Sequence, residues 1–294
     1  MLRLRLFVAT LKAFSLRKPL RHPMTRIRDA AAQGDAEAQY QIGEAYLAGW
    51  SVPRHPATGA HWLRLAAEQG HVRAQHSLSL LYMSGAKAMG DAASWLRETA
   101  ASGNAILFYP NGLDVKPDPE KALVLAKAAA EQGLACAQAN LGMFYLRGIG
   151  CKQDFTKAQL WCRRAAEQNE SVGALGLGFM HEHGFGIERN PSEAARWYAI
   201  GTELGNDAAA TALGLLHLDG IGVERNLVKA QKLMAGPASR GDALAKKGLT
   251  ELYAIAESEE QTAIDPDQRD MTDTCVAGTR RARVLGGHQS RYNA

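Results

Sequence analysis

The feature that most constrains this sequence is a repeat of 36 residues. The pair Leu-Gly returns at this interval, and a Gly-x-Gly motif follows each pair by seven residues. The copies are Leu141-Gly142, Leu177-Gly178 and Leu213-Gly214, followed by Gly148-x-Gly150, Gly184-x-Gly186 and Gly220-x-Gly222, with Ile42-Gly43 as an earlier copy of the first pair. A period in this range is the signature of an array of small units that pack on their neighbours. The chain is therefore expected to form a repeat array and not one compact core.

A third mark with the same period predicts the starts of helices. Its members are Asp118, Asp154, Asn190 and Asn226, each followed four residues later by alanine. Asp and Asn are favoured N-cap residues because their side-chain oxygens accept hydrogen bonds from the free amides of the first helical turn. Pro119 and Pro191 occupy the first helical position, where proline loses no hydrogen bond. Glu193 has the spacing that completes a capping box with Asn190.

Two helices are predicted in each repeat. In the first helix, Ala137, Leu141 and Tyr145 lie at i, i+4 and i+8 and so share one face. The glycine of Leu-Gly costs about 1 kcal/mol relative to alanine inside a helix, so its recurrence predicts a point where a neighbouring helix backbone comes too close for a Cβ. The second helix ends in a Gly or Asn that is expected to be a left-handed cap. Eight residues before this cap stand four tryptophans, which are predicted to fill the core: Trp62, Trp95, Trp161 and Trp197.

Composition and charge support a helical array without a nucleic-acid partner. Alanine is frequent and β-branched residues are sparse, which favours helix over sheet. The formal net charge is +4, but residues 1–28 hold eight basic side chains and no acidic one, which leaves −4 for residues 29–294. The repeat region therefore lacks the basic surface that neutralises phosphates, and no binding of nucleic acid is expected.

The pattern A-x-x-x-L-G-x-x-Y-x-x-G-x-G-V, followed by D-x-x-K-A-x-x-W-Y-x-x-A-A-E-Q-G, resembles the Sel-one-like repeat (SLR) family over about residues 24–255. This family is related to the tetratricopeptide repeat. The resemblance implies an all-α, right-handed α-solenoid of antiparallel helix pairs, with about six to seven repeats. It also implies a scaffold or adaptor that binds a partner protein or peptide on its concave face without a cofactor. An alternative stays open, in which the protein is a regulatory or structural subunit of a membrane-associated complex.

The copies are not all complete. The closing Gly or Asn of the second helix falls at residues 34, 70, 103, 133, 169, 205 and 241, so two intervals are shorter than 36. In the third copy Tyr109 follows the preceding closing position, Gly103, by only six residues, whereas Tyr46 follows Gly34 by twelve in the first copy. We therefore expect a degenerate third repeat with a kink at residues 104–118. The predicted domains are a basic amphipathic leader or extension (1–23), the repeat solenoid (24–255) and a disordered tail (256–294).

A partner-binding groove is predicted from the resemblance to tetratricopeptide repeats. There, the residues two before and two and five after the Leu of each Leu-Gly pair would face the groove. These positions hold Tyr40, Glu44, Leu47, His76, Leu80, Met83, Ala139, Met143, Leu146, Leu175, Phe179, Glu182, Thr211, Leu215 and Leu218. The set is largely apolar. Packing between adjacent repeats and a groove for a partner helix or extended peptide both remain open.

No catalytic or metal site is expected. His181, Glu182 and His183 look like metal ligands, but His181 and His217 occupy the position of Tyr145 and are interpreted as packing aromatics. The cysteines lack the spacing of a disulfide framework or a zinc knuckle, so free thiols are expected at Cys136, Cys151, Cys162 and Cys275. No catalytic triad, Cys-His pair or phosphate-binding loop has a fitting context. The chain is therefore not expected to be an enzyme.

The two ends differ from the repeats. Leu4, Phe7 and Leu11 lie at helical spacing among basic residues, so residues 1–23 are a targeting signal, a membrane-surface helix or an extension before a native start at Met24. A cytoplasmic location is expected unless this segment is a targeting signal, in which case the protein is exported or organellar. At the other end, residues 243–256 are predicted to form a last helix that covers the final repeat.

Overall fold

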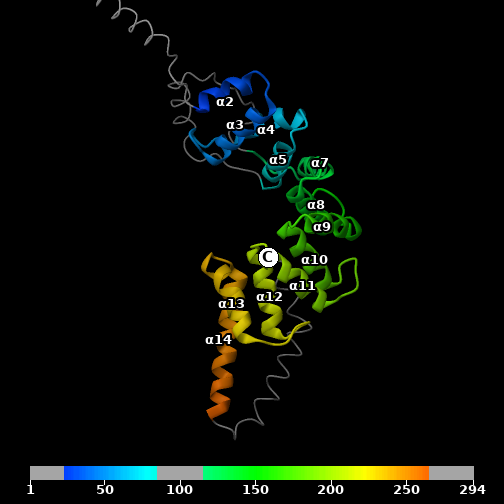
Figure 1. Cartoon of the computed structure of the whole chain (residues 1–294), viewed down its shortest axis with the longest axis vertical. Coiled ribbons are helices and arrows are strands. Elements are labelled where there is room, and N and C mark those ends of the chain that lie inside the picture. The colour runs from blue at the N-terminus through cyan, green and yellow to red at the C-terminus, as the bar shows by residue number, and fades with distance from the viewer. Residues whose placement is uncertain (1–22, 85–114, 265–294) are drawn as a thin grey trace, which may run out of the picture. The chain divides into compact units, whose positions relative to one another are not determined.

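The computed structural model describes residues 23–84 and 115–264, in which the regular elements are all α-helices (Figure 1). They are α2 (Pro23–Ala32), α3 (Ala36–Ala48), α4 (Pro56–Glu68), α5 (Val72–Ser84), α7 (Pro119–Glu131), α8 (Ala135–Arg147), α9 (Phe155–Glu167), α10 (Ser171–His183), α11 (Pro191–Glu203), α12 (Asp207–Asp219), α13 (Leu227–Ser239) and α14 (Ala243–Ile264). They fall into two compact units: unit 1, within residues 1–153, and unit 2, within residues 154–294. The predicted all-α fold is confirmed.

Side-chain caps start the second helix of the repeats as predicted. At α7, α9, α11 and α13 the side chains of Asp118, Asp154, Asn190 and Asn226 accept hydrogen bonds of 2.8–3.1 Å from the amides three residues later. The predicted capping box is wrong in its second half, because the Asn190 amide donates to the His181 carbonyl (2.8 Å) and not to Glu193. The Glu193 carboxylate accepts from Arg196 instead (3.1 Å).

Glycines with positive φ form the turns between helices. Gly150 has φ +69, and a Cβ there would lie 2.2 Å from the Pro119 carbonyl oxygen at the start of α7. In unit 2, Gly222 approaches Pro191 in the same way, with 2.3 Å to the carbonyl carbon. Only glycine meets both the positive φ and the close contact. The residues that close the second helices also have positive φ, including Asn169 (φ 60), as predicted.

The glycine of the Leu-Gly pair lies where the two helices of one repeat cross. A Cβ on Gly178 of α10 would lie 2.5 Å from the Tyr198 ring of α11. In the first repeat the backbones themselves approach, since a Cβ on Gly59 of α4 would lie 2.9 Å from the Gly43 carbonyl oxygen of α3. The predicted close approach of a backbone thus holds at Gly43, and at Gly214 with 3.3 Å from a Cβ there to the Ala230 carbonyl oxygen. At Gly43, Gly178 and Gly214 alike the nearest atom belongs to a side chain of the second helix in the same repeat.

The innermost position of the second helix is one residue beyond the predicted tryptophans. It holds Leu63, Ala126, Cys162, Tyr198 and Met234, each at most 1% exposed. Trp161 is buried, Trp62 and Trp197 are half-buried, and Trp95 lies outside the described residues. The tryptophans therefore flank the core, and the prediction that they fill it is correct for Trp161 alone among the described members.

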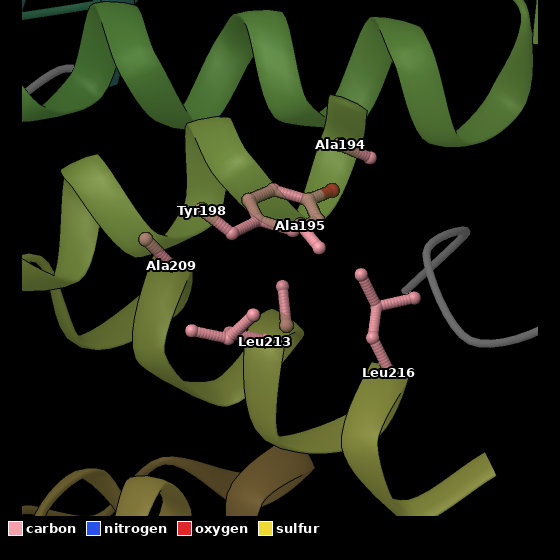
Figure 2. Packing of buried hydrophobic residues seen from close by; sticks show 7 residues of the cluster. Ala194, Ala195, Tyr198, Ala209, Leu213 and Leu216 are labelled. Atoms are coloured by element: carbon pink, nitrogen blue, oxygen red, sulfur yellow. The ribbon is translucent and has the colours of Figure 1, made fainter. Parts of the chain in front are cut away.

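Figure 2 shows one such core in unit 2, where Tyr198 of α11 lies between Ala195 and Ala209 and faces Leu213 of α12. The alanines bring the helices close enough for the tyrosine ring to fill the space between them. The Tyr198 hydroxyl donates to Glu182 of α10 (2.6 Å), whose side chain is buried. A polar contact thus joins α10 to α11 inside the apolar core.

Helices α5 and α7 form a single repeat although residues 85–118 separate them. The Asp118 amide donates to the Tyr82 carbonyl (2.7 Å), as the His55 amide donates to the Tyr46 carbonyl between α3 and α4 (2.8 Å). Asp118 follows Tyr82 by 36 residues, whereas His55 follows Tyr46 by nine. The chain therefore carries 27 additional residues between the first and second helices of this repeat.

A buried hydroxyl confirms the pairing of α5 with α7. Ser79 replaces the glycine of the Leu-Gly pair in α5 and donates to the Ala122 carbonyl of α7 (2.7 Å). The first helix of the predicted second copy thus pairs with the second helix of the predicted third copy, which corrects the expected register between residues 71 and 133. The predicted kink at 104–118 lies mostly outside the described residues; the helices on either side of it belong to one compact unit, and the kink stays a prediction.

Helix α14 confirms the predicted last helix and extends it to Ile264. Leu252 of α14 packs in a buried cluster with Met234 of α13. Arg225, in the turn before α13, forms an ion pair with Glu259 of α14 (2.8 Å). Residues 256–264, which were predicted to belong to a disordered tail, are thus helical, and residues 265–294 lie outside the described part.

Candidate protein-binding surface

The predicted groove positions of α3 and α5 lie side by side in unit 1. Tyr40 and Leu47 of α3 pack against the buried cluster that contains Leu78 and Leu81. The Tyr40 ring also stacks on His71, just before α5, with ring centroids 4.8 Å apart. Two helices that are 36 residues apart in sequence therefore pack on one buried cluster and meet near the start of α5.

Six side chains of this surface remain partly accessible. They are Tyr40, Glu44, Leu47, His76, Leu80 and Met83, named here the α3–α5 stripe. Met83 is 38% exposed and the other five are half-buried. Four of the six are apolar or aromatic, and contiguous apolar side chains of this kind mark interaction surfaces on soluble proteins.

The polar groups of the stripe give it an acidic character. Helix α3 carries the carboxylates of Glu37 and Glu44 and no basic side chain. A hydrogen bond from His71 (2.9 Å) is the main cause that lowers the pKa of Glu37. Burial, followed by the nearby Glu44 carboxylate, raises the pKa of Tyr40. The carboxylates of α3 therefore lie beside a phenol whose pKa is raised, and the Arg73 guanidinium of α5 lies close enough to lower the pKa of both Glu37 and Tyr40.

Buried glutamines, which sequence reasoning missed, hold these helices in place. Gln39 of α3 donates to the Ala31 carbonyl of α2 (3.2 Å) and accepts from Gln69 at the end of α4 (2.7 Å). Gln75 of α5 repeats both bonds one repeat later. The sequence did contain a pattern that could have predicted them, because glutamine recurs at one position of the first helix of the repeat, as Gln39, Gln75 and Gln138. These bonds fix the spacing of helices whose outer side chains form the stripe.

The remaining predicted groove positions are less accessible. Met143 in unit 1 and Leu175 and Phe179 in unit 2 are half-buried. The buried members are Ala139, Leu146, Glu182, Thr211, Leu215 and Leu218. Leu215 and Leu218, for example, pack in the cluster formed with α13 and α14. These six side chains contribute to packing and present no surface to a partner in this structure.

The histidines and the buried cysteine are parts of the packing. The ring of His217 is buried, with Nδ1 3.0 Å from the Glu224 carbonyl oxygen, and burial lowers the pKa of His181. Burial raises the pKa of the Cys162 thiol to about 12, so it is no nucleophile at neutral pH. Within residues 23–84 and 115–264 no group of three metal-binding side chains comes together, and no helix is long and apolar enough to cross a membrane.

Capped helix pairs that recur along the chain and cross at a glycine define an α-helical repeat protein. A family model described as the Sel1 repeat matches residues 36–71, 105–134, 137–170, 171–206 and 207–235, more than half of the chain. The chain belongs to the Sel1 repeat family, whose members generally mediate protein-protein interactions. The matched ranges leave out α5, which begins one residue after the first range ends, although the structure pairs α5 with α7.

Solved structures show the same solenoid. A protective antigen of uropathogenic Escherichia coli with an SLR fold is 29% identical over 80% of this chain, with a TM-score of 0.59. The match covers 45% of the antigen's own chain. A Sel1 repeat protein from Oxalobacter formigenes is 25% identical over 81% of each chain, with a TM-score of 0.61. No curated protein matches this sequence.

Proposed function

We propose that this protein is an interaction scaffold that binds a partner protein or peptide along the α3–α5 stripe. The observation that carries the proposal is the accessibility of all six predicted groove positions on these two adjacent helices. The equivalent positions of α12 are buried. A bound helix or extended segment would remove Leu80 and Met83 from water, and the flexible methionine would adapt to its shape.

The polar members of the stripe favour a partner segment that carries a basic side chain. One carboxylate oxygen of Glu44 is buried and has no hydrogen-bond partner in the described part of the chain, so a cation there would gain more than on an open surface. The Tyr40 phenol adds a hydrogen-bond donor beside it. The apolar side chains would supply affinity, and the carboxylate would orient the segment.

Affinity capture from extract of the native source tests this function. The full chain, its Leu80→Glu variant and a Leu160→Glu control are used as baits, since Leu160 is an exposed leucine of α9 in unit 2. The expected result is a partner retained by the wild type and the control but lost by Leu80→Glu, with equal helical circular dichroism. Retention by Leu80→Glu, or equal loss by both variants, would contradict the proposal.

The alternative function is a regulatory or structural subunit of a membrane-associated complex. It is supported by residues 1–28, which hold eight basic side chains and no acidic one. A chain that starts at Met24 separates the two functions in the same capture experiment. Loss of the partner together with loss of the protein from the membrane fraction would favour the alternative; a partner that is retained would favour the α3–α5 stripe.

A further inference from the structure

Helix α14 corresponds to the first helix of a repeat, but no described helix follows to pair with it. Thr250 stands 36 residues after Gly214, the residue through which α12 meets α13. Tyr253 is 48% exposed, whereas Tyr46 and His217, at the same repeat position, are 7% and 6% exposed. The side of α14 that would contact a second helix is therefore open to solvent in the described part of unit 2.

Four side chains follow one another along this open side. Lys246, Thr250, Tyr253 and Glu257, named here the α14 free face, are spaced i, i+4, i+7 and i+11 and so share one face of the helix. Contacts with α13 border this face: Leu249 and Leu252 pack with Met234, and the Tyr253 hydroxyl accepts a hydrogen bond from the Gln231 side chain (3.1 Å). Within the described residues neither Lys246 nor Glu257 takes part in an ion pair, and both are exposed.

The α14 free face is complementary to itself. If two copies of α14 pack antiparallel about a twofold axis, Lys246 of each copy faces Glu257 of the other, and Thr250 faces Tyr253. Opposite charges then meet at both ends, and the exposed tyrosines cover the centre. A parallel arrangement would instead place Lys246 against Lys246, which is unfavourable.

We propose that the α14 free face is a dimerisation surface that pairs with the same face of a second copy of this chain. Twofold pairing through one shared surface is the commonest way in which soluble proteins associate. Thr250 at the glycine position opposes the close crossing of a further repeat helix, but an ordinary antiparallel pair 8–10 Å apart accommodates it. Since a single helix pair buries little area, the dimer is weak and depends on concentration.

Light scattering of the full chain after size exclusion, from micromolar to millimolar concentration, tests the dimer. The expected mass rises from 31.7 kDa toward twice that value as concentration increases. Lys246→Glu and Glu257→Lys each create two like-charge contacts in the symmetric dimer and should raise its dissociation constant roughly tenfold. The double variant Lys246→Glu/Glu257→Lys restores both pairs and should return the constant close to the wild-type value.

Lys152→Glu serves as the matched control, because Lys152 is an exposed lysine of unit 1, outside both α13 and α14. It should leave the dissociation constant unchanged. A protein that stays monomeric at all concentrations overturns the proposal. This would also be the outcome if residues 265–294 covered the α14 free face. A dimer that both single variants leave intact, or that the double variant fails to restore, overturns it as well.

Discussion

The α3–α5 stripe of unit 1 and helix α12 of unit 2 use the same repeat positions in opposite ways. In unit 1 the α3–α5 stripe remains half exposed, whereas in unit 2 every residue of α12 from Thr211 to Leu218 is buried. Leu215 and Leu218 are covered because α13 and α14 pack against them in one cluster. A position within the repeat therefore sets the direction of a side chain, and the neighbouring helices determine whether a partner can reach it.

The units also differ in how regularly they follow the repeat. From residue 133 onward the closing residues are spaced by 36, whereas the repeat of α5 and α7 contains 27 additional residues. The insertion leaves the contacts within that repeat intact, since the Tyr82 carbonyl and the Ser79 hydroxyl still bond to the start of α7. A solenoid tolerates such an insertion because each repeat contacts only its neighbours.

The largest change in unfolding free energy is expected when leucines at the same repeat position in the two units are replaced by alanine. Leu215→Ala removes a buried side chain of unit 2 and should cost about 2–5 kcal/mol of unfolding free energy. Leu80→Ala removes a half-buried side chain of unit 1 and should cost less, about 1 kcal/mol. Urea denaturation measures both. Equal losses would show that the α3–α5 stripe belongs to the core and would break the contrast between the units.

The next effect concerns the buried polar contact of unit 2. Tyr198→Phe removes the donor to Glu182 and should cost about 1–3 kcal/mol, because a buried carboxylate loses a hydrogen bond. Tyr253→Phe is the control, since the Tyr253 hydroxyl bonds to Gln231 at an exposed site and its loss should cost about 0.5 kcal/mol or less. Both are measured by thermal unfolding at low concentration. A larger loss for the control would contradict the assignment of Glu182 to the packing.

A smaller change, in the pH dependence of helix stability, is expected to distinguish a histidine cap in unit 1 from the asparagine caps in unit 2. His55 caps α4 through Nδ1, which accepts from the Thr58 amide (3.1 Å), where α11 and α13 have asparagine. Burial lowers the pKa of His55, so the cap is fully present above the unfolded value of about 6.5 and is lost as pH falls below it. We expect α4 to lose about 1 kcal/mol of amide protection in acid relative to α11.

The variant His55→Asn should remove this part of the pH dependence, because asparagine caps a helix without titrating. The pKa of His61 on the same helix is also lowered by burial, so His61→Asn is compared in parallel. Hydrogen exchange on α4 near pH 7.5 and pH 5.5 gives the result. Acid sensitivity that survives His55→Asn but disappears in His61→Asn would assign the effect to His61 instead.

The smallest effect is expected from removing the insertion. The turn sequence of residues 220–225 can replace residues 85–117, which restores the spacing of nine between Tyr82 and Asp118. If α5 and α7 are one repeat, the variant keeps its cooperative unfolding and changes melting temperature by only a few degrees, since little beyond Val115 is lost from the described packing. If these residues instead held most of two repeats, the variant would unfold, and the assignment would be wrong.

Local interactions are the part of this fold that the sequence predicted well. The caps at Asp118 and Asn226, the left-handed residues that close the helices and the glycine crossing all depend on neighbours in sequence or on one adjacent helix. The pairing of helices between residues 71 and 133 was predicted wrongly, because Trp95 and Gly103 were interpreted as marks of the second helix that follows residues 72–84. The contact between α5 and α7, which spans 36 residues from Tyr82 to Asp118, corrected it.

The period of 36 residues, with its caps and turns, was sufficient to determine the helix pairs, because each mark acts through local backbone geometry. Only the tertiary structure determined which members of the predicted groove are accessible, since burial depends on helices far along the chain. It left Leu80 and Met83 partly open while covering Leu215 and Leu218 with α13 and α14. It likewise left Tyr253 exposed where Tyr46 is buried, because no described helix pairs with the end of the array.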